Sequence, residues 1–302
     1  MRTYILIGVA VIALGVSAVP LFGSSPVPTH PVARILFGGD VMFDRYIRTM
    51  SDARGADYPL SCIRETLVPY DLVVANLEGP ITSFESVSVG TSVGAPDNTR
   101  FTFPPRTATV LQSSGIDVVH LGNNHILDFG PDGLMETKNA LSASGVAYFG
   151  DPDRREEERI LERTVHGVPI TFVSWSDWAV QSVEETERAL RAAREANRVP
   201  IVFAHWGDEY VGAPERVREL ARRFVDQGAK LVVGSHSHVE GEYEEYRGVP
   251  IYYSLGNFVF DQYFSEEVRN GILLSAEVTP EGVMRVERIP IRLERDGRTC
   301  LR

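Results

Sequence analysis

The residues best suited to chemistry are two histidines that follow an apolar run. His236 and His238 come after residues 231–233, Leu-Val-Val, which are typical of a buried strand, and Gly234 and Ser235 mark the turn at its end. Two imidazoles at positions i and i+2 of a loop can face one point, as a metal site requires. A single pair of this kind is more often part of a polar surface loop, so its meaning depends on whether the arrangement recurs.

The same arrangement recurs at four other predicted strand ends. Each apolar run stops at a residue that carries an oxygen or a ring nitrogen. These residues are Asp40 after 33–37, Glu78 after 71–75, Asn124 and His125 after 116–121, and His205 after 199–204. The chain has seven histidines, and four of them fall at such ends. Because the carboxyl ends of parallel strands meet at one edge of a sheet, we expect these side chains to form one site.

This set of side chains predicts a metal centre. Two carboxylates, an amide and several imidazoles suit borderline divalent ions such as Zn²⁺, Mn²⁺ or Fe²⁺. The set is too rich in nitrogen for a dedicated Ca²⁺ or Mg²⁺ site. Its size suits two ions that share a carboxylate, and such a pair activates a water molecule and stabilises an anionic transition state.

The elements that must position these residues alternate between strands and helices and end in a β-rich tail. Helices are predicted at 106–114, 131–144, 183–197 and 214–227, and in pieces over 45–68; a closing hairpin is predicted at 271–278 and 283–293. This order favours an α/β sandwich in which the early strands are largely parallel. Residues 83–105 are rich in Ser, Gly, Thr and Pro, and we interpret them as a flap over the site.

Six motifs along the chain resemble those of a known family, the CapA-type poly-γ-glutamate capsule biosynthesis proteins. They are Gly39-Asp40-Val41-Met42, Asn76-Leu77-Glu78, Asn123-Asn124-His125, His205-Trp206-Gly207, His236-Ser237-His238 and Leu255-Gly256-Asn257-Phe258. The family is a branch of the calcineurin-like metallophosphoesterase superfamily, and the resemblance runs from about residue 34 to about residue 264. It implies a four-layer α/β/β/α sandwich around two metal ions.

The resemblance also implies a role for each candidate residue. Asp40 and His238 would hold the first ion, and Glu78 would bridge the two ions. The second ion would be held by Asn124, His205 and His236. His125 would act as a general acid or stabilise an oxyanion.

The chain departs from the superfamily pattern in its first motif. That motif is Asp-x-His, but the third position here is Met42, which we interpret as a core residue. The first metal site is therefore incomplete unless Asn76 or water replaces the missing ligand. Asn257 belongs to the narrower family's motif, and it would either line the substrate side or stabilise a turn.

The N-terminus predicts a membrane anchor. Residues 4–22 carry no charge and are almost entirely apolar, and about 20 such residues can span a bilayer. We expect a transmembrane helix over 1–23, a Pro/Ser-rich tether over 24–33 and one folded domain over 34–302. Arg2 precedes the span and favours a single-pass protein at the cell membrane whose domain lies outside the cytoplasm. Secretion after cleavage of a signal peptide is the alternative.

Composition limits the classes of partner. The formal net charge of −11 argues against nucleic acid, which binds basic surfaces. With 302 residues, 43% of them hydrophobic, the chain can bury a large core. Cys62 and Cys300 lack metal-ligand spacing; they could pair in an oxidising compartment, but we expect two unpaired buried thiols.

The predicted function is that of a membrane-anchored, extracytoplasmic, metal-dependent hydrolase in the synthesis of a capsule or cell-envelope polymer resembling poly-γ-glutamate. Its expected partners are the membrane, other subunits of a capsule synthesis complex, and an anionic polymer or phosphoester substrate. One alternative is a general phosphoesterase. The other is a non-catalytic subunit of a polymer synthesis or export complex. Met42 favours this alternative because it stands in place of a superfamily ligand, whereas the intact histidines favour catalysis.

Overall fold

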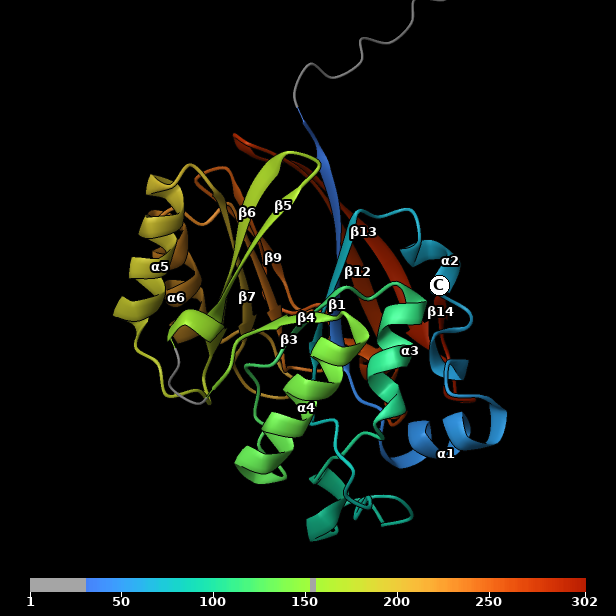
Figure 1. Cartoon of the computed structure of the whole chain (residues 1–302). Helices are drawn as coiled ribbons and strands as arrows, with labels where there is room; N and C mark the ends of the chain where they lie inside the picture. Colours follow the sequence, from blue (N-terminus) through green and yellow to red (C-terminus); the bar gives the residue numbers. More distant parts are fainter. Residues whose placement is uncertain (1–30, 153–155) are drawn as a thin grey trace, which may run out of the picture.

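The computed structural model describes residues 31–152 and 156–302, and it shows two β-sheets packed face to face with helices on their outer sides (Figure 1). Three apolar cores separate the resulting four layers. One core lies between the two sheets, and each of the others lies between a sheet and the helices that cover it. The α/β class expected from the sequence is confirmed.

The first sheet has eight strands within the described residues, and its parallel half delivers the first group of candidate ligands. Its order is β14-β13-β12-β1-β2-β3-β4, with β11 also paired to β1. Strands β1 to β4 and β11 run parallel, whereas β12, β13 and β14 run antiparallel. The strands are β1 (Ala33–Val41), β2 (Leu72–Leu77), β3 (Val118–His120), β4 (Ala147–Phe149), β11 (Asn257–Val259), β12 (Asn270–Thr279), β13 (Gly282–Leu293) and β14 (Thr299–Leu301).

The second sheet has six strands in the described part of the chain, and its central strands deliver the remaining histidines. Its order is β5-β6-β7-β8-β10-β9, with a parallel centre and an antiparallel strand at each edge. The strands are β5 (Ile160–Val165), β6 (Val168–Ser176), β7 (Val199–His205), β8 (Leu231–Ser235), β9 (Tyr243–Tyr246) and β10 (Val249–Tyr252).

Amphipathic helices cover both outer faces. In α6, the apolar residues Val217, Ala221 and Phe224 recur at helical spacing and pack on the second sheet. A reciprocal pair of hydrogen bonds between Ser182 and Glu185 caps the start of α5. The helices on the first sheet are α1 (Arg45–Arg54), α2 (Arg64–Leu67), α3 (Arg106–Ser114) and α4 (Gly130–Ser144); those on the second are α5 (Val183–Glu195) and α6 (Glu215–Asp226). The short α7 (Glu266–Arg269) precedes β12, and 3-10 turns lie at Tyr58–Leu60, Pro96–Thr99 and Glu156–Arg159.

Strand β1 differs from the sequence prediction, which ended it before a turn at Gly38 and Gly39. The strand instead continues through both glycines to Val41. A Cβ atom on Gly39 would overlap the carbonyl group of Gly256, and one on Gly38 would meet the ring of Phe258. The glycines therefore allow the segment 255–258 to pack directly against β1, and this contact pairs Asp40 with Asn257.

The prediction of a transmembrane helix, and with it of a single-pass protein at the cell membrane, is corrected. Among residues 31–152 and 156–302, no helix combines the length and the apolar character needed to cross a bilayer. The predicted anchor over 1–23, its alternative as a cleaved signal peptide, and most of the tether over 24–33 fall outside the described residues.

The two cysteines are joined by a disulfide, which corrects the expectation of two unpaired thiols. Cys62 precedes α2 and Cys300 lies in β14, and their Cα atoms are 5.0 Å apart. Figure 1 shows the C-terminal strand beside α2. The pairing was only the less favoured alternative from the sequence, because 238 residues separate the two positions and only the fold brings them together.

Reduction of this disulfide is expected to destabilise the protein strongly. A bond that closes so long a loop removes much of the entropy of the unfolded chain, and it stabilises a fold by about 2–5 kcal/mol. Urea unfolding with and without dithiothreitol measures the difference. A Cys62→Ser/Cys300→Ser variant is the control, because dithiothreitol should not change its midpoint. Equal midpoints for the oxidised and reduced native protein would contradict the prediction.

Candidate metal centre

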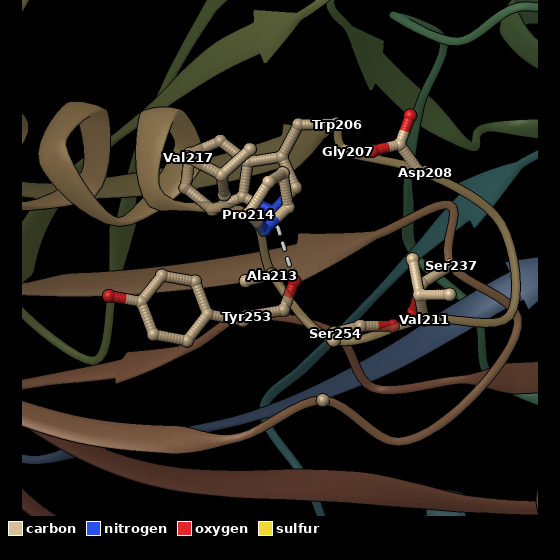
Figure 2. A pocket seen from close by; sticks show the side chains of 12 residues that line it. Trp206, Gly207, Asp208, Val211, Ala213, Pro214, Val217, Ser237, Tyr253 and Ser254 are labelled. Atoms are coloured by element: carbon tan, nitrogen blue, oxygen red, sulfur yellow. Dashed lines mark hydrogen bonds between the residues drawn. The ribbon is translucent and has the colours of Figure 1, made fainter.

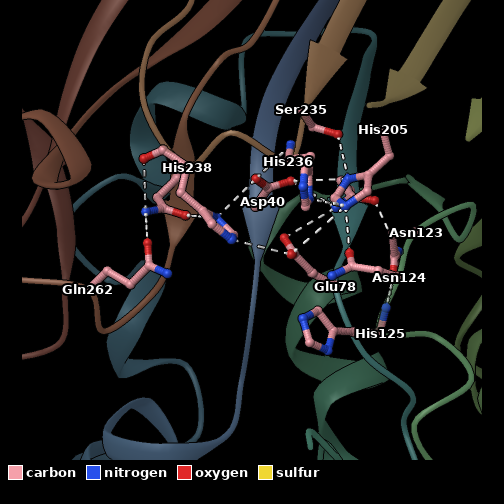
Figure 3. A network of polar contacts seen from close by, with 12 residues as sticks. Asp40, Glu78, Asn123, Asn124, His125, His205, Ser235, His236, His238 and Gln262 are labelled. Atoms are coloured by element: carbon pink, nitrogen blue, oxygen red, sulfur yellow. Dashed lines mark hydrogen bonds and ion pairs between the residues drawn. The ribbon is translucent and has the colours of Figure 1, made fainter. Parts of the chain in front are cut away.

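The strand ends bring the predicted ligands together where the carboxyl ends of β1, β2, β7 and β8 meet (Figure 3). Asp40 lies in β1, Glu78 follows β2, His205 ends β7, and His236 and His238 follow β8. All five side chains are buried, with at most 4% of any residue exposed. A cluster of carboxylates and imidazoles this deep is rare unless its members are paired or bind a cation.

These residues form two groups that share Glu78. One group is Asp40, Glu78 and His238, and the other is Glu78, His205 and His236; within each group the ligand atoms lie within 4.8 Å of one another. Glu78 Oε1 is 3.6 Å from His238 Nε2 and 4.0 Å from His205 Nε2. The shared carboxylate therefore stands between two potential cation positions.

In the second group, lone-pair-bearing atoms converge on one ring nitrogen. His205 Nε2 is 2.8 Å from Asn124 Oδ1 and 3.1 Å from His236 Nδ1. At the other side of this ring, His205 Nδ1 lies 2.9 Å from Ser235 Oγ, whose own hydrogen is donated to the Ala204 carbonyl. With Ser235 as the acceptor, the tautomer that carries its proton on His205 Nδ1 leaves a lone pair on Nε2. An amide oxygen and two imidazole nitrogens arranged in this way suit a cation.

In the first group, too, a neighbouring side chain orients the ligand histidine. His238 Nδ1 lies 2.9 Å from Asn257 Oδ1, and the amide nitrogen of Asn257 donates to the carbonyls of His238 and Val268. Because this amide nitrogen is committed to donation, Asn257 Oδ1 accepts the Nδ1 proton and leaves His238 Nε2 free toward Glu78. Outer partners of metal-binding histidines work in this way. Asn257 therefore braces His238, a role that differs from both of those predicted for it.

Asn76, the predicted substitute ligand, lies behind the two carboxylates. Its amide nitrogen is 2.8 Å from Asp40 Oδ1 and 3.5 Å from Glu78 Oε2, and its oxygen accepts from Asn123 at 3.1 Å. His120, which contacts the same oxygen and Ser174 Oγ, is buried in the strand. The network therefore places Asn76 as a donor that orients carboxylates.

Met42 occupies the position of the missing histidine and packs in the core. Its side chain is fully buried in the apolar cluster under α1 to α4. The thioether sulfur accepts a hydrogen bond from the backbone of Asp44 at 2.9 Å. The interpretation of Met42 as a core residue is confirmed, and the first group has three acidic or imidazole ligands.

Several site residues were not predicted from the sequence. Asn123, Ser235 and Asp128 act through other side chains, and Trp178 packs against His236 with ring centroids 4.3 Å apart. Ser235 and Asn123 adjoin predicted ligands in the sequence, which is the one signal that could have identified them.

Burial and mutual charge determine the protonation of the cluster. Burial and the negative charge of Asp40 hold the pKa of Glu78 well above its usual value. Burial would also raise the pKa of Asp40, but the hydrogen bond and charge of His238 outweigh it, and the pKa is lowered. Burial lowers the pKa of His205 well below 6.5 and that of His236 to about 4, so both imidazoles are neutral at pH 7.

Three structural observations indicate that the site fits a divalent cation. Glu78 Oε1 is buried and has no hydrogen-bond partner. Imidazole nitrogens face it from both groups. His236 and His238 also adopt left-handed backbone angles, with φ of 93° and 57°, which are unfavourable for residues other than glycine. A bound ion would give the Glu78 oxygen and the imidazole nitrogens a partner. Its binding would also offset the cost of the strained backbone at His236 and His238.

His125 lies beside the two groups and carries its own acidic partner. Its Nδ1 is 3.0 Å from Asp128 Oδ2, and its ring packs on Phe101 with centroids 4.4 Å apart. Asp128 Oδ2 also accepts from the Phe101 backbone at 2.7 Å. A carboxylate that accepts the Nδ1 proton leaves Nε2 available for proton transfer.

A cavity of about 460 Å³ opens onto both His125 and His238. Its walls also include Arg45, Glu209 and Phe264, and a large share comes from the predicted flap, residues 83–105. Its volume falls in the range of sites that bind small molecules.

A second pocket lies beside Trp206 and has room for about one water at about 10 Å³ (Figure 2). The indole nitrogen of Trp206 donates a hydrogen bond to the Tyr253 carbonyl there.

The metal-free protein is expected to lose stability as the pH falls from 6.5 toward 4. Burial lowers the pKa of His236 to about 4 and that of His120 to about 3, so the unfolded chain binds more protons than the folded chain over that range. Each buried histidine contributes a slope of up to about 1.4 kcal/mol per pH unit. Glu78, with its raised pKa, partly offsets this slope above pH 4.5 because it has the opposite sign.

Urea unfolding in EDTA at pH 7, 6 and 5 measures this dependence. In a His120→Gln variant, the slope of stability against pH should be smaller by the contribution of one histidine. His120 lies outside both ligand groups, so the substitution leaves the candidate metal ligands in place. An identical slope in the variant would show that His120 is not neutral in the folded state.

Fold and site together define a two-sheet α/β protein with a buried candidate centre for two metal ions. The chain belongs to the bacterial capsule synthesis protein family PGA_cap, which matches residues 34–262. The resemblance found in the sequence to CapA-type proteins is thereby confirmed.

Named relatives agree with this assignment. "PGA biosynthesis protein CapA" of Bacillus subtilis (strain 168) is 30% identical over 84% of this chain and 70% of that protein. "Capsule biosynthesis protein CapA" of Bacillus anthracis is 26% identical over 85% of this chain and 66% of that protein. A "probable polyglutamine synthesis accessory protein" of Mycobacterium tuberculosis is 26% identical over 87% of this chain and 86% of its own length. The chain thus spans about two thirds of the two Bacillus proteins.

Proposed function

We propose that this protein acts in the synthesis of a bacterial capsule or envelope polymer of the polyglutamate type, as a metal-dependent hydrolase. The polymer class is supported by the names of the relatives, two of which are capsule or PGA biosynthesis proteins. The hydrolase activity rests chiefly on one observation: the buried, unpartnered Glu78 oxygen is shared by two groups of ligands. A shared carboxylate is the usual arrangement for two ions that act on one reacting group.

Each residue would have a defined task in this reaction. Asp40, Glu78 and His238 would hold one ion, and Glu78, His205 and His236, with Asn124, would hold the other. Ions bound there would supply an activated water and positive charge for an anionic transition state. The nitrogen-rich ligand set suits Mn²⁺, Zn²⁺ or Fe²⁺.

His125 would act as the general acid on the side of the site that faces the substrate. Asp128 accepts its Nδ1 proton at 3.0 Å and fixes the orientation of the ring. With His125 and His238 both lining the 460 Å³ cavity, a substrate there would contact the proton donor and the ions at once. General acid catalysis by a positioned histidine accelerates a reaction about 10²–10⁴-fold.

Two other functions each have an observation in their favour. The superfamily resemblance supports a general phosphoesterase that acts on nucleotides or phospho-sugars. Met42, buried where the superfamily has a ligand, supports a non-catalytic subunit of a polymer synthesis complex, in which the metal site would be vestigial.

Metal analysis followed by a substrate panel separates these functions. The protein is stripped with EDTA, reloaded with Mn²⁺ or Zn²⁺, and assayed on bis(p-nitrophenyl) phosphate and on oligo-γ-glutamate. Release of glutamate or shorter oligomers is the expected result. Turnover of the phosphodiester alone would favour the general phosphoesterase. Less than about half an equivalent of metal after reloading would exclude both enzymes and leave the non-catalytic role.

A further inference from the structure

Arg45 occupies an unusual position between the flap and the metal centre. It is the first residue of α1, its φ is 48°, and its guanidinium group lines the 460 Å³ cavity. A left-handed backbone is unfavourable for arginine, so interactions of its side chain must hold it there. Those interactions connect segments that are far apart in the sequence.

The guanidinium group links the two walls of the cavity. Arg45 forms an ion pair with Asp261 on one wall, and its Nη1 lies 3.4 Å from both oxygens of Asn98 on the flap. Asn98 is itself buried and donates to Thr91, another flap residue, at 3.0 Å. Arg45 therefore ties the flap segment 83–105, drawn in teal in Figure 1, to the opposite wall of the cavity.

The same guanidinium group packs against two phenyl rings that reach the site histidines. Its Cζ atom is 5.0 Å from the Phe101 centroid and 5.4 Å from the Phe260 centroid. Phe101 packs on His125 at 4.4 Å, and Phe260 packs on His238 at 4.8 Å. A cation over an aromatic face is attracted to it, more so when water is excluded, so Arg45 stabilises both rings in place.

We propose that Arg45 is a positioning residue: it holds the flap closed over the metal centre and, through Phe101 and Phe260, sets the orientation of His125 and His238. The proposal rests on the function proposed above, because it assigns the reaction to the closed cavity. The planar fork of arginine is essential to this role, since it pairs with Asp261 while its faces contact the rings.

The test replaces Arg45 and measures the flap separately from the chemistry. In Arg45→Met, amide hydrogen exchange over residues 88–100 should become at least about tenfold faster, because the ion pair and both ring contacts are lost. Metal content should equal that of the native protein. With bis(p-nitrophenyl) phosphate or oligo-γ-glutamate, whichever the native protein hydrolyses, kcat should fall about 100-fold while KM changes little, as expected for a misplaced catalytic group.

Two further variants distinguish the clamp from general damage to α1. Arg54→Met removes the same charge from the same helix, but Arg54 packs over the Tyr58 ring away from the flap and the cavity, so flap exchange and kcat should stay within about threefold of native. Arg45→Lys keeps the charge and loses the fork, and it should recover less than half of the lost flap protection.

Three results would overturn the proposal. They are unchanged flap exchange in Arg45→Met, full recovery by Arg45→Lys, and loss of metal from Arg45→Met, which would mean that Arg45 supports the ligands directly. If the native protein binds no metal, the proposed hydrolase function fails, but the exchange measurement still decides whether Arg45 clamps the flap.

Discussion

A Glu78→Gln variant is expected to lose both metal ions at once. Glu78 is the one residue common to the two ligand groups, and glutamine keeps its shape while removing the negative charge. Metal affinity at both positions should fall by more than about 100-fold, because the loss of an outer partner alone costs about 10–100-fold. Atomic absorption or native mass spectrometry of the reloaded protein measures the stoichiometry.

Single-histidine variants provide the matched controls for this prediction. His236→Ala and His238→Ala each remove a ligand from one group only, so each should keep the ion held by the other group. His236 belongs to the fuller group, which also has Asn124 within reach of His205, so its loss should cost more metal than the loss of His238. The opposite ranking would contradict the assignment of ligands to the two groups.

The stability of the metal-free Glu78→Gln protein separates loss of binding from misfolding. The carboxyl of Glu78 is buried with a raised pKa and an unpartnered oxygen, so it does not stabilise the metal-free fold. In EDTA, the variant should unfold at the same urea concentration as the native protein or at a higher one. A clearly lower midpoint would mean that the lost metal reflects a damaged fold.

A His125→Ala variant is expected to lose about 10²–10⁴-fold in kcat while it keeps its metal. His125 is absent from both ligand groups, but it lines the cavity with His238 and carries a proton partner in Asp128. Metal content and kcat are measured on the same preparation, with the substrate that the native protein hydrolyses.

An Asp128→Asn variant distinguishes proton transfer from simple contact. Asparagine can still accept a hydrogen bond but lacks the charge that stabilises a protonated imidazole, so kcat should fall less than in His125→Ala and the pH profile should shift to lower pH. Full activity in His125→Ala would exclude the proposed role of this histidine and leave the chemistry to the metal centre alone.

Much of the fold could be predicted from local patterns. Helix α3 begins and ends at the predicted residues, and α6 differs from its prediction by one residue at each end, because apolar periodicity and stop signals are local properties. The short strands β4, β11 and β14 were not predicted as strands, since three-residue segments carry too little pattern and form only because longer neighbours pair with them. Strand β5 carries no clear strand pattern either, because it is an edge strand with exposed charges.

The sequence by itself determined which residues could form the site. Asp40, Glu78, His205, His236 and His238 each follow an apolar run, and in a parallel sheet such ends share one edge. This inference needs only the period of the strands and the direction of the chain. The sequence therefore sufficed for the candidate ligands and for the family.

Tertiary structure alone decided how these residues are held. Ser235 and Asn257 select the free nitrogen of a histidine, Cys62 pairs with Cys300, and Arg45 joins the flap to the opposite wall. Each of these is a contact between side chains that depends on the relative placement of separate elements. Hydrogen-bond direction, disulfide geometry and ring packing act over a few ångströms in space, and spacing along the chain does not encode them.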